Sequence, residues 1–299
     1  MKPTHASRSH LRAWLLATRP RTLPAAVAPV AVGTAVAIAD QGFAALPALA
    51  ALSGALLLQI AVNLANDYFD YRRGIDTEQR VGPVRVTQSG LIAPGRVLGA
   101  MWLVLVLAGI CGAYLATVGG WPIIVIGLAS MAGVIGYSGG PYPLASHGLG
   151  DLFVFIFFGP VAVCGTYYVQ VLTLTGTVVI WAVPPGLLIA AILVVNNLRD
   201  IETDRSAGKQ TLAVIIGPHY TRIEYTLLVL LAYAFPPIML ATGASQPLIL
   251  LPFLTFPLGG LCIRKIYQEN GRVLNARLGA TAMLALWFST LLAIGIVVS

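Results

Sequence analysis

The distribution of apolar residues constrains this chain more than any other feature of its sequence. Of its 299 residues, 58% are hydrophobic and 10% are charged, whereas a soluble domain has about 45–50% apolar and about 25% charged residues. The apolar residues gather in runs close to the length of about 20 that a helix needs to cross a bilayer. The sequence predicts an all-α integral membrane protein with nine such helices, at 23–39, 43–65, 97–117, 121–138, 152–173, 177–197, 225–242, 247–263 and 278–298.

The basic residues predict the orientation of these helices. All 18 lysines and arginines fall in the N-terminal arm and in the loops after the second, sixth and eighth predicted spans. The positive-inside rule therefore places the N-terminus in the cytoplasm and, after nine spans, the C-terminus outside. Topology thus explains the net charge of +7, and we identify no nucleic-acid-binding module. We expect a cytoplasmic or interfacial arm at 1–22 and a single transmembrane domain at 23–299.

Carboxylates gather after the second and sixth predicted spans. If each span continues as a helix, polar residues spaced by three or four fall on one face of it. Polar side chains at this depth are costly and usually face a cavity or a partner. We therefore expect two polar stripes to meet at one cytoplasm-facing cavity: Gln59, Asn63, Asp67 and Asp70 on the second span, and Asn196, Asp200 and Asp204 on the sixth.

Opposed carboxylates with basic residues between them suit a divalent cation that binds a phosphate-bearing ligand. Mg²⁺ takes one or two carboxylates together with ligand phosphates, and arginine or lysine meets the remaining phosphate charge. The chain has no glycine-rich phosphate loop of the nucleotide type. Two alternatives remain open. The charges belong to ordinary solvated loops, or they carry ions in a secondary transporter, although transporter sites usually lie near the membrane midplane.

The loop after the fourth predicted span, residues 137–151, has no lysine or arginine and is rich in glycine, proline and tyrosine. Such a loop favours a close-packed surface with aromatic faces, suited to a flat ring substrate. The alternative is an ordinary turn-rich connection. Its single histidine, His147, and the later His219 receive no catalytic role from the sequence.

The two carboxylate clusters lie in segments that resemble the Asp-rich motifs of the UbiA superfamily of membrane prenyltransferases, NLANDYFDYRRGID (63–76) and NNLRDIETDRSAGKQTLAV (196–214). Four further segments are similar to the branch of that superfamily that acts on 1,4-dihydroxy-2-naphthoate. They read RPRTLPA (19–25), RVGPVRVTQSGL (80–91), YSGGPYPL (137–144) and GLGDLFVFIFFGPVAVCGTYYVQ (148–170).

The resemblance implies a UbiA-type bundle of nine transmembrane helices around a cytoplasm-facing cavity, in the bacterial cytoplasmic (inner) membrane. It implies Mg²⁺ as cofactor, with a polyprenyl diphosphate and an aromatic acceptor as partners beside membrane lipid. No nucleic acid and no obligate protein partner is expected. The implied reaction is Mg²⁺-dependent transfer of the polyprenyl group to 1,4-dihydroxy-2-naphthoate with loss of CO₂, which gives demethylmenaquinone.

The resemblance also implies roles for individual residues. The catalytic, metal-binding residues are Asn66, Asp70, Asp200 and Asp204. A further metal ligand is Asp76, separated from Asp70 by five residues where the superfamily motif has three, a longer form that the naphthoate branch shares. The expected diphosphate-binding residues are Arg80, Arg199 and Lys209, and the expected acceptor-binding residues are Tyr137, Tyr142 and Asn63. Supporting residues behind these are Asp67, Asn196 and Asn197.

The acceptor is the least constrained part of this interpretation. Relatives that prenylate 4-hydroxybenzoate often carry a lysine shortly after the tyrosine of the middle loop. Here Tyr142 is followed by Pro143 and Leu144 without a lysine, which argues against that acceptor. The alternatives are a related transferase acting on 4-hydroxybenzoate or homogentisate and, from another functional class, a secondary transporter.

Overall fold

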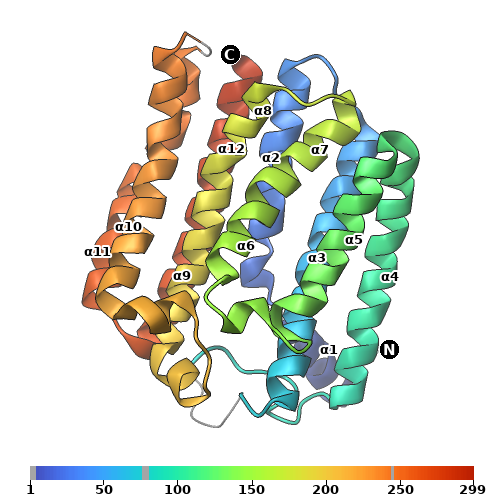
Figure 1. Cartoon of the computed structure of the whole chain (residues 1–299), viewed down its shortest axis with the longest axis vertical. Coiled ribbons are helices and arrows are strands. Elements are labelled where there is room, and N and C mark those ends of the chain that lie inside the picture. The colour runs from blue at the N-terminus through green and yellow to red at the C-terminus, as the bar shows by residue number, and fades with distance from the viewer. Residues whose placement is uncertain (1–4, 76–80, 244–245) are drawn as a thin grey trace.

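The computed structural model describes residues 5–75, 81–243 and 246–299, with side chains from residue 11 onward. Over these ranges the chain folds into a bundle of helices (Figure 1). In chain order the elements are α1 His5–Thr18, η1 Pro20–Thr22, α2 Pro24–Ala39, α3 Ala45–Arg72, α4 Pro94–Gly119, α5 Trp121–Ser138, η2 Leu144–Ser146, α6 Gly150–Ile156, η3 Phe157–Val161, α7 Ala162–Val171, α8 Gly176–Trp181, α9 Val183–Ser206, α10 Leu212–Ala241, η4 Pro247–Thr255, α11 Phe256–Gln268, η5 Gly271–Val273 and α12 Leu274–Val298.

The described residues contain eight helical segments that are long and apolar enough to span a membrane. A ninth span is obtained when residues 11–22 and α2, which meet at a bend of 48°, are taken together. The 16 residues of α2 extend only about 24 Å as a straight helix, short of a hydrocarbon core about 30 Å thick. The prediction of an all-α membrane protein is confirmed, and its first span is the bent one.

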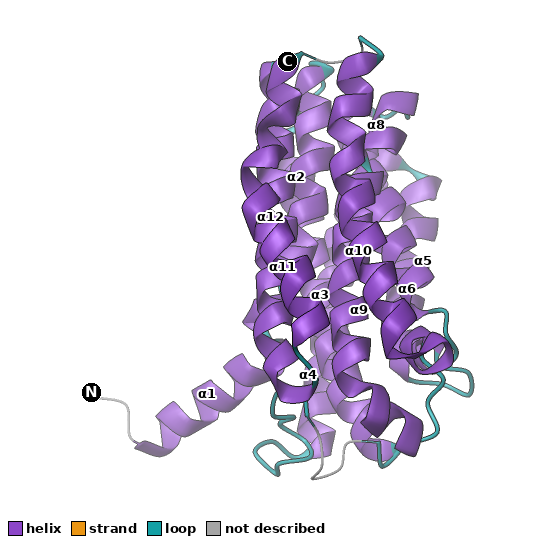
Figure 2. Ribbon diagram, turned by 90° about the vertical axis from the view of Figure 1, so that its left-hand side faces the viewer, coloured by secondary structure: helices purple, strands orange, loops and turns teal. Residues whose placement is uncertain are grey.

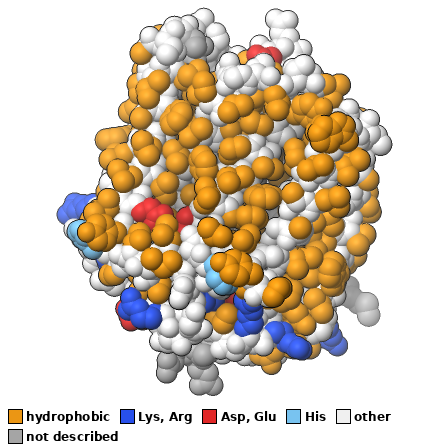
Figure 3. Space-filling view, viewed as in Figure 1, with side chains coloured by type: hydrophobic (Ala, Val, Ile, Leu, Met, Phe, Trp, Pro, Cys, Tyr) orange, Lys and Arg blue, Asp and Glu red, His pale blue; other side chains and the backbone are white. Residues whose placement is uncertain are grey.

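The surface separates apolar from charged regions. Figure 3 shows hydrophobic side chains over most of one face, with lysine and arginine gathered toward the lower end of the bundle. The C-terminus lies at the opposite, upper end (Figure 1). A wide apolar belt with charge at one end is the pattern of a helix bundle solvated by lipid.

Helix α1 stands apart from the bundle. It projects sideways from the lower end of the helices (Figure 2). Leu11, Leu15 and Leu16 are exposed on it, whereas Trp14 packs against the bundle. The N-terminal arm is therefore helical in its described part, and the division into an arm at 1–22 and a domain at 23–299 stays a prediction.

The buried apolar side chains form two separate clusters. One joins α2 with α7 through α12 and contains Trp181, Tyr225 and Phe288. The other joins α1, α3, α4 and α5 around Leu64 and Met101. The span made of α8 and α9 is the most enclosed, with 72% of its apolar window buried, so its neighbours are mainly protein rather than lipid.

The span that begins with α6 changes its helical winding midway. Residues Phe157–Val161 form a π-helical turn that contains Pro160, and proline has no N–H for the normal α-helical hydrogen bond. At the same turn Gly159 faces Gly186 of α9, where an added Cβ would lie 2.9 Å from the Gly159 Cα. Only glycine allows these two backbones to approach so closely.

Candidate active site

A cavity of about 810 Å³ lies between the two apolar clusters. Its walls come from α3, α4 and α5 on one side and from α2, α6, α7 and α9 on the other. One end is polar, and the remainder is lined mainly by apolar and small side chains. Such a cavity fits a ligand with a charged head and a long apolar tail. The polar end is formed by Asn66, Asp70, Arg85, Asn196, Asn197, Asp200, Asp204 and Lys209.

A single lysine connects the two carboxylate clusters. The Lys209 Nζ atom lies 3.7 Å from Asp70 Oδ1 and 3.7 Å from Asp204 Oδ1. Its position follows from the end of α9, where Gly208 adopts a φ of +74° and the Lys209 N–H donates a 2.9 Å hydrogen bond to the Asp204 carbonyl. Glycine adopts this left-handed conformation at no steric cost. The structure therefore brings the expected residues of α3 and α9 to one place.

An arginine outside the predicted set completes this end of the cavity. The Arg85 Nη2 atom donates a 2.9 Å hydrogen bond to Asp70 Oδ2, and both side chains are buried. The loop that carries Arg85 is held from α3, because the Asp67 carboxylate accepts hydrogen bonds from the backbone N–H groups of Val86 (3.0 Å) and Thr87 (2.9 Å). The only signal for Arg85 in the sequence is that it lies within the family-like segment at 80–91.

Arg199 is directed at neighbouring side chains. Its guanidinium donates two hydrogen bonds to Asp200, of 2.8 and 2.5 Å. It also donates hydrogen bonds of 2.8 Å to the Oδ1 atoms of Asn196 and of Asn275 in α12. Arg199 is buried and does not line the cavity, whereas Asp200 does. This geometry favours a role in fixing the Asp200 carboxylate.

Two of the three expected acceptor-binding residues line the cavity, and the third lies outside it. Tyr137 of α5 lines the cavity. Asn63 also lines the cavity. Its Nδ2 atom donates two hydrogen bonds of 3.0 Å, one to the Thr18 carbonyl and one to Thr22 Oγ1. Tyr142 is exposed outside the cavity lining and stacks on His147 with 3.6 Å between ring centroids. Tyr137 and Asn63 therefore line the cavity, and Tyr142 does not.

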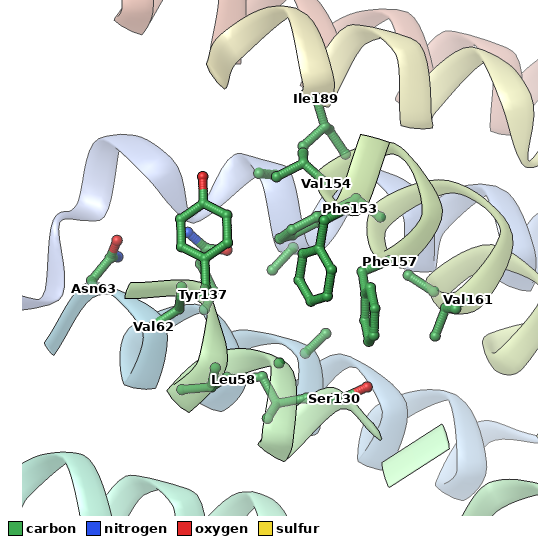
Figure 4. Close-up of a pocket in the computed structure, with 18 of the residues that line it drawn as sticks. Leu58, Val62, Asn63, Ser130, Tyr137, Phe153, Val154, Phe157, Val161 and Ile189 are labelled. Atoms are coloured by element: carbon green, nitrogen blue, oxygen red, sulfur yellow. The ribbon is translucent and has the colours of Figure 1, made fainter. Parts of the chain in front are cut away.

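A row of aromatic rings lies beyond the polar end. The ring centroids of Tyr137 and Phe153 are 6.0 Å apart, and those of Phe153 and Phe157 are 4.2 Å apart. Figure 4 shows these three side chains between α3, which carries Leu58, and the Ile189 side of α9. The two phenylalanines were not predicted individually, although their spacing of four residues within an apolar segment places them on one helical face.

The donor chemistry of the polar end fits Mg²⁺. Carboxylate and amide oxygens are the protein ligands that this hard cation prefers. The Asn66 Oδ1 atom is buried and has no hydrogen-bond partner within the described part of the chain, so it is an oxygen that a cation would satisfy. Within the same ranges, no three His, Cys, Asp or Glu side chains form a close metal-ligand group. The expected ligand Asp76 and the expected diphosphate-binding Arg80 lie outside the described residues.

Comparison with known sequences points to one family. The UbiA prenyltransferase family matches residues 26–289. A 1,4-dihydroxy-2-naphthoate octaprenyltransferase from Mycobacterium tuberculosis is 46% identical over 212 residues, which cover 71% of this chain and 72% of that protein. The enzyme of the same name from Bacillus subtilis is 32% identical over 288 residues, with 96% of this chain and 92% of that protein covered.

Solved structures share the fold. The apo structure of a UbiA homologue from Aeropyrum pernix matches with a TM-score of 0.66 and 16% identity, over 91% of this chain and 97% of that one. A UbiA homologue from Archaeoglobus fulgidus, bound to DMAPP and Mg²⁺, matches with a TM-score of 0.59 and 14% identity, over 95% and 99% of the two chains. The sequence match across most of the chain and this shared architecture agree, and the chain belongs to the UbiA prenyltransferase family.

Proposed function

We propose that this chain is the prenyltransferase that joins a polyprenyl group to 1,4-dihydroxy-2-naphthoate with loss of CO₂, forming demethylmenaquinone in menaquinone biosynthesis. The observation that carries the proposal is one cavity whose polar end unites Asp70, Asp204 and Lys209 and whose remaining length is apolar. A polyprenyl diphosphate has this division between charged head and apolar tail. The relatives named 1,4-dihydroxy-2-naphthoate octaprenyltransferase support the choice of acceptor.

The diphosphate belongs at the polar end. Asp70, Asp200 and Asp204, with Asn66 and the expected Asp76, would hold Mg²⁺. When bound, Mg²⁺ supplies the positive charge that stabilises the departing diphosphate. Support for a magnesium-dependent prenyl donor also comes from the Archaeoglobus fulgidus homologue bound to DMAPP and Mg²⁺.

Basic side chains complete the diphosphate site. Lys209 and Arg85 line the cavity beside the carboxylates and would bind the phosphate oxygens that the cation leaves uncovered. Arg80 keeps its expected role of the same kind. Arg199 contributes through Asp200, whose carboxylate it orients with two hydrogen bonds.

The reacting carbon belongs beside the aromatic row. When the allylic C–O bond breaks, its electron pair leaves with the diphosphate, and the resulting cation faces the rings of Tyr137, Phe153 and Phe157. Aromatic faces attract a cation electrostatically without forming a covalent bond to it, and the apolar walls exclude water that would react with it. The ring carbon that bears the acceptor's carboxylate then forms the new C–C bond, and CO₂ leaves with its bonding electrons returned to the ring.

The acceptor enters between the aromatic row and the loop after the fourth predicted span, residues 137–151. Tyr137 lines the cavity beside this loop, and Asn63 and Tyr142 are proposed as further acceptor contacts. The reaction would take place at the cytoplasmic face of the bacterial inner membrane, with the C-terminus outside. The basic end of the bundle and the placement of the C-terminus at the opposite end support this orientation.

The experiment is a product assay on the purified protein in detergent with Mg²⁺ and geranyl diphosphate. Parallel reactions hold 1,4-dihydroxy-2-naphthoate, 4-hydroxybenzoate or homogentisate, and a further reaction with the naphthoate contains EDTA. Mass spectrometry should detect a prenylated product that lacks the carboxylate mass, only with the naphthoate and only without EDTA. Product from another acceptor alone would retain the transferase and overturn its acceptor. No product in any reaction from folded protein would overturn the proposed function.

A further inference from the structure

One buried carboxylate, Asp151, has no part in the site described above. It lies in the first turn of α6 and is 8% exposed. Both of its carboxylate oxygens lack a hydrogen-bond partner within the described residues. Its charge acts on Glu224 of α10, which is also acidic and therefore does not compensate it. Burial of a carboxylate without partners costs free energy, so this group calls for a functional explanation.

Asp151 lies behind Tyr137, the tyrosine in the cavity wall. A Cβ added to the neighbouring Gly150 would lie 3.5 Å from the Tyr137 hydroxyl oxygen, so the start of α6 packs against that hydroxyl. Three carboxylates act on the hydroxyl, and Asp151 acts on it more strongly than Asp70 or Asp204. Tyr137 lines the cavity, whereas Asp151 does not. The tyrosine therefore stands between a buried carboxylate and the space for the acceptor.

The proposed reaction needs a group that holds a proton for part of the cycle. In 1,4-dihydroxy-2-naphthoate one hydroxyl is next to the ring carbon that bears the carboxylate. When that carbon bonds to the allylic cation, the hydroxyl oxygen becomes a carbonyl oxygen and gives up its proton. Because the apolar walls exclude water, the protein has to supply the group that takes this proton.

Few ionisable side chains are available for this step. Those in the described lining of the cavity are Arg19, Asp70, Arg85, Tyr137, Asp200, Asp204 and Lys209. The three aspartates are assigned to Mg²⁺, and the protonated side chains of arginine and lysine donate hydrogen bonds but do not accept them. Tyr137 remains. A neutral phenol takes up a proton only if it passes its own proton on, and Asp151 is the carboxylate placed to receive that proton.

We propose that Asp151 is the proton acceptor of the transfer reaction and that it acts through Tyr137. As the new C–C bond forms, the acceptor hydroxyl passes its proton to the Tyr137 oxygen, and Tyr137 passes its own proton to the Asp151 carboxylate. When CO₂ leaves, the electron pair of the broken bond returns to the ring and its oxygen. That oxygen takes the proton back through Tyr137, and Asp151 is ionised again. The cycle consumes no proton. This inference rests on the proposed function and adds its proton acceptor.

The first test compares Asp151→Asn with wild type, using geranyl diphosphate and the naphthoate. The amide has nearly the same shape but does not take the proton. We expect kcat to fall about a hundredfold or more, as general base catalysis contributes, with KM for geranyl diphosphate within about threefold. The unfolding temperature should not fall, because no hydrogen bond is lost and an unpaired buried charge is removed. Asp151→Glu keeps a carboxylate and should recover about tenfold or more of the lost kcat.

The chain offers a matched control at its other end. Asp40 accepts a 2.5 Å hydrogen bond from the Tyr167 hydroxyl, and neither residue lines the cavity. Asp40→Asn and Tyr167→Phe therefore remove the same chemical groups outside the site. Both variants should keep kcat within about twofold of wild type.

The second test separates proton transfer from a structural role. Without the proton acceptor the allylic cation still forms but bonds to the ring more slowly, so water captures more of it as geraniol. The ratio of geraniol to prenylated product should rise about tenfold or more in Asp151→Asn and in Tyr137→Phe, which keeps the aromatic ring. If the two residues act as one unit, the double variant should be no slower than the slower single variant.

The two proposals fail separately. A wild-type kcat in Asp151→Asn, an unchanged product ratio, or losses that add in the double variant would overturn the role of Asp151, while turnover by the wild type would uphold the proposed function. Absence of wild-type turnover with every acceptor would overturn the proposed function, together with the role of Asp151 that rests on it.

Discussion

Arg85 and Asp70 form a buried ion pair, with 2.9 Å between Nη2 and Oδ2, although they lie 15 positions apart along the chain. The pair joins the loop between α3 and α4 to the polar end of the cavity. A charge removed from such a pair leaves its partner buried with less compensation, which costs about 3–5 kcal/mol. The loop is therefore part of the site and not merely a connection.

The first prediction concerns this pair. Arg85→Met should lower the thermal unfolding temperature and raise the KM for prenyl diphosphate about tenfold or more, because Asp70 and the substrate phosphate both lose a cation. Arg85→Lys keeps the charge without the planar fork, so it should restore stability more fully than KM. Steady-state kinetics and thermal unfolding of the two variants check this. A wild-type KM in Arg85→Met would contradict a diphosphate contact.

The second prediction separates the loop's anchor from its chemistry. Asp67→Asn leaves one oxygen to accept from two backbone N–H groups. The amides of Val86 and Thr87 should therefore exchange with deuterium faster, and the KM for prenyl diphosphate should rise. Hydrogen exchange at these two amides is the decisive measurement, because a residue that only contacts substrate would not change it. Asp40→Asn, at the opposite end of the bundle, is the control and should leave both amides protected. Unchanged exchange in Asp67→Asn would rule out the anchoring role.

The third prediction concerns the two carboxylates that face Lys209. Asp70→Ala and Asp204→Ala should each lower kcat about a hundredfold or more, equivalent to about 2.7 kcal/mol, while the protein stays monodisperse in detergent. Each should also weaken the binding of Mn²⁺ with diphosphate, measured by electron paramagnetic resonance. Glu202→Ala provides the control, because Glu202 lies on α9 between Asp200 and Asp204 and its side chain is 84% exposed. Near-normal activity in either aspartate variant would contradict a metal site shared by α3 and α9.

The fourth prediction distinguishes a structural arginine from the arginines proposed to bind the diphosphate. Arg222 donates hydrogen bonds to the Ile266 carbonyl (2.9 Å) and to Asn270 Oδ1 (2.6 Å), which join α10 to the end of α11. Arg222→Ala should therefore lower the unfolding temperature by about 2–4 °C and leave kcat/KM within about threefold. The exposed Arg205→Ala should change neither quantity. A selective loss of activity in Arg222→Ala, without loss of stability, would refute this assignment.

Helical periodicity was sufficient to predict burial on α3. Gln59, Asn63, Asp67 and Asp70 were expected on one inward face, and all four are buried. Their partners were not predictable, because they come from distant parts of the chain. Asn63 binds the N-terminal arm, Asp67 binds the loop before α4, and Asp70 meets Arg85 and Lys209. Periodicity specifies the face of a helix but not the segment that returns to cover it.

The cavity residues that were not predicted from the sequence lack the distinctive polar pattern of the Asp-rich motifs. Phe153 and Phe157 lie in an apolar span where aromatic residues are common, so only the cavity distinguishes them from lipid-facing neighbours. Arg199 shows the converse case. The resemblance implies a diphosphate contact for this residue, whereas the hydrogen bonds of its guanidinium to Asp200 and to Asn275 of α12 could not be predicted from the sequence. The direction of a long side chain depends on tertiary packing and cannot be read from spacing.

The cavity separates two apolar clusters instead of lying inside one. A polyprenyl chain that fills it would therefore supply the layer of hydrocarbon that a continuous interior would otherwise have provided. The bound donor would then make apolar contacts with both clusters, and its binding would stabilise the packing of the two halves of the bundle against each other.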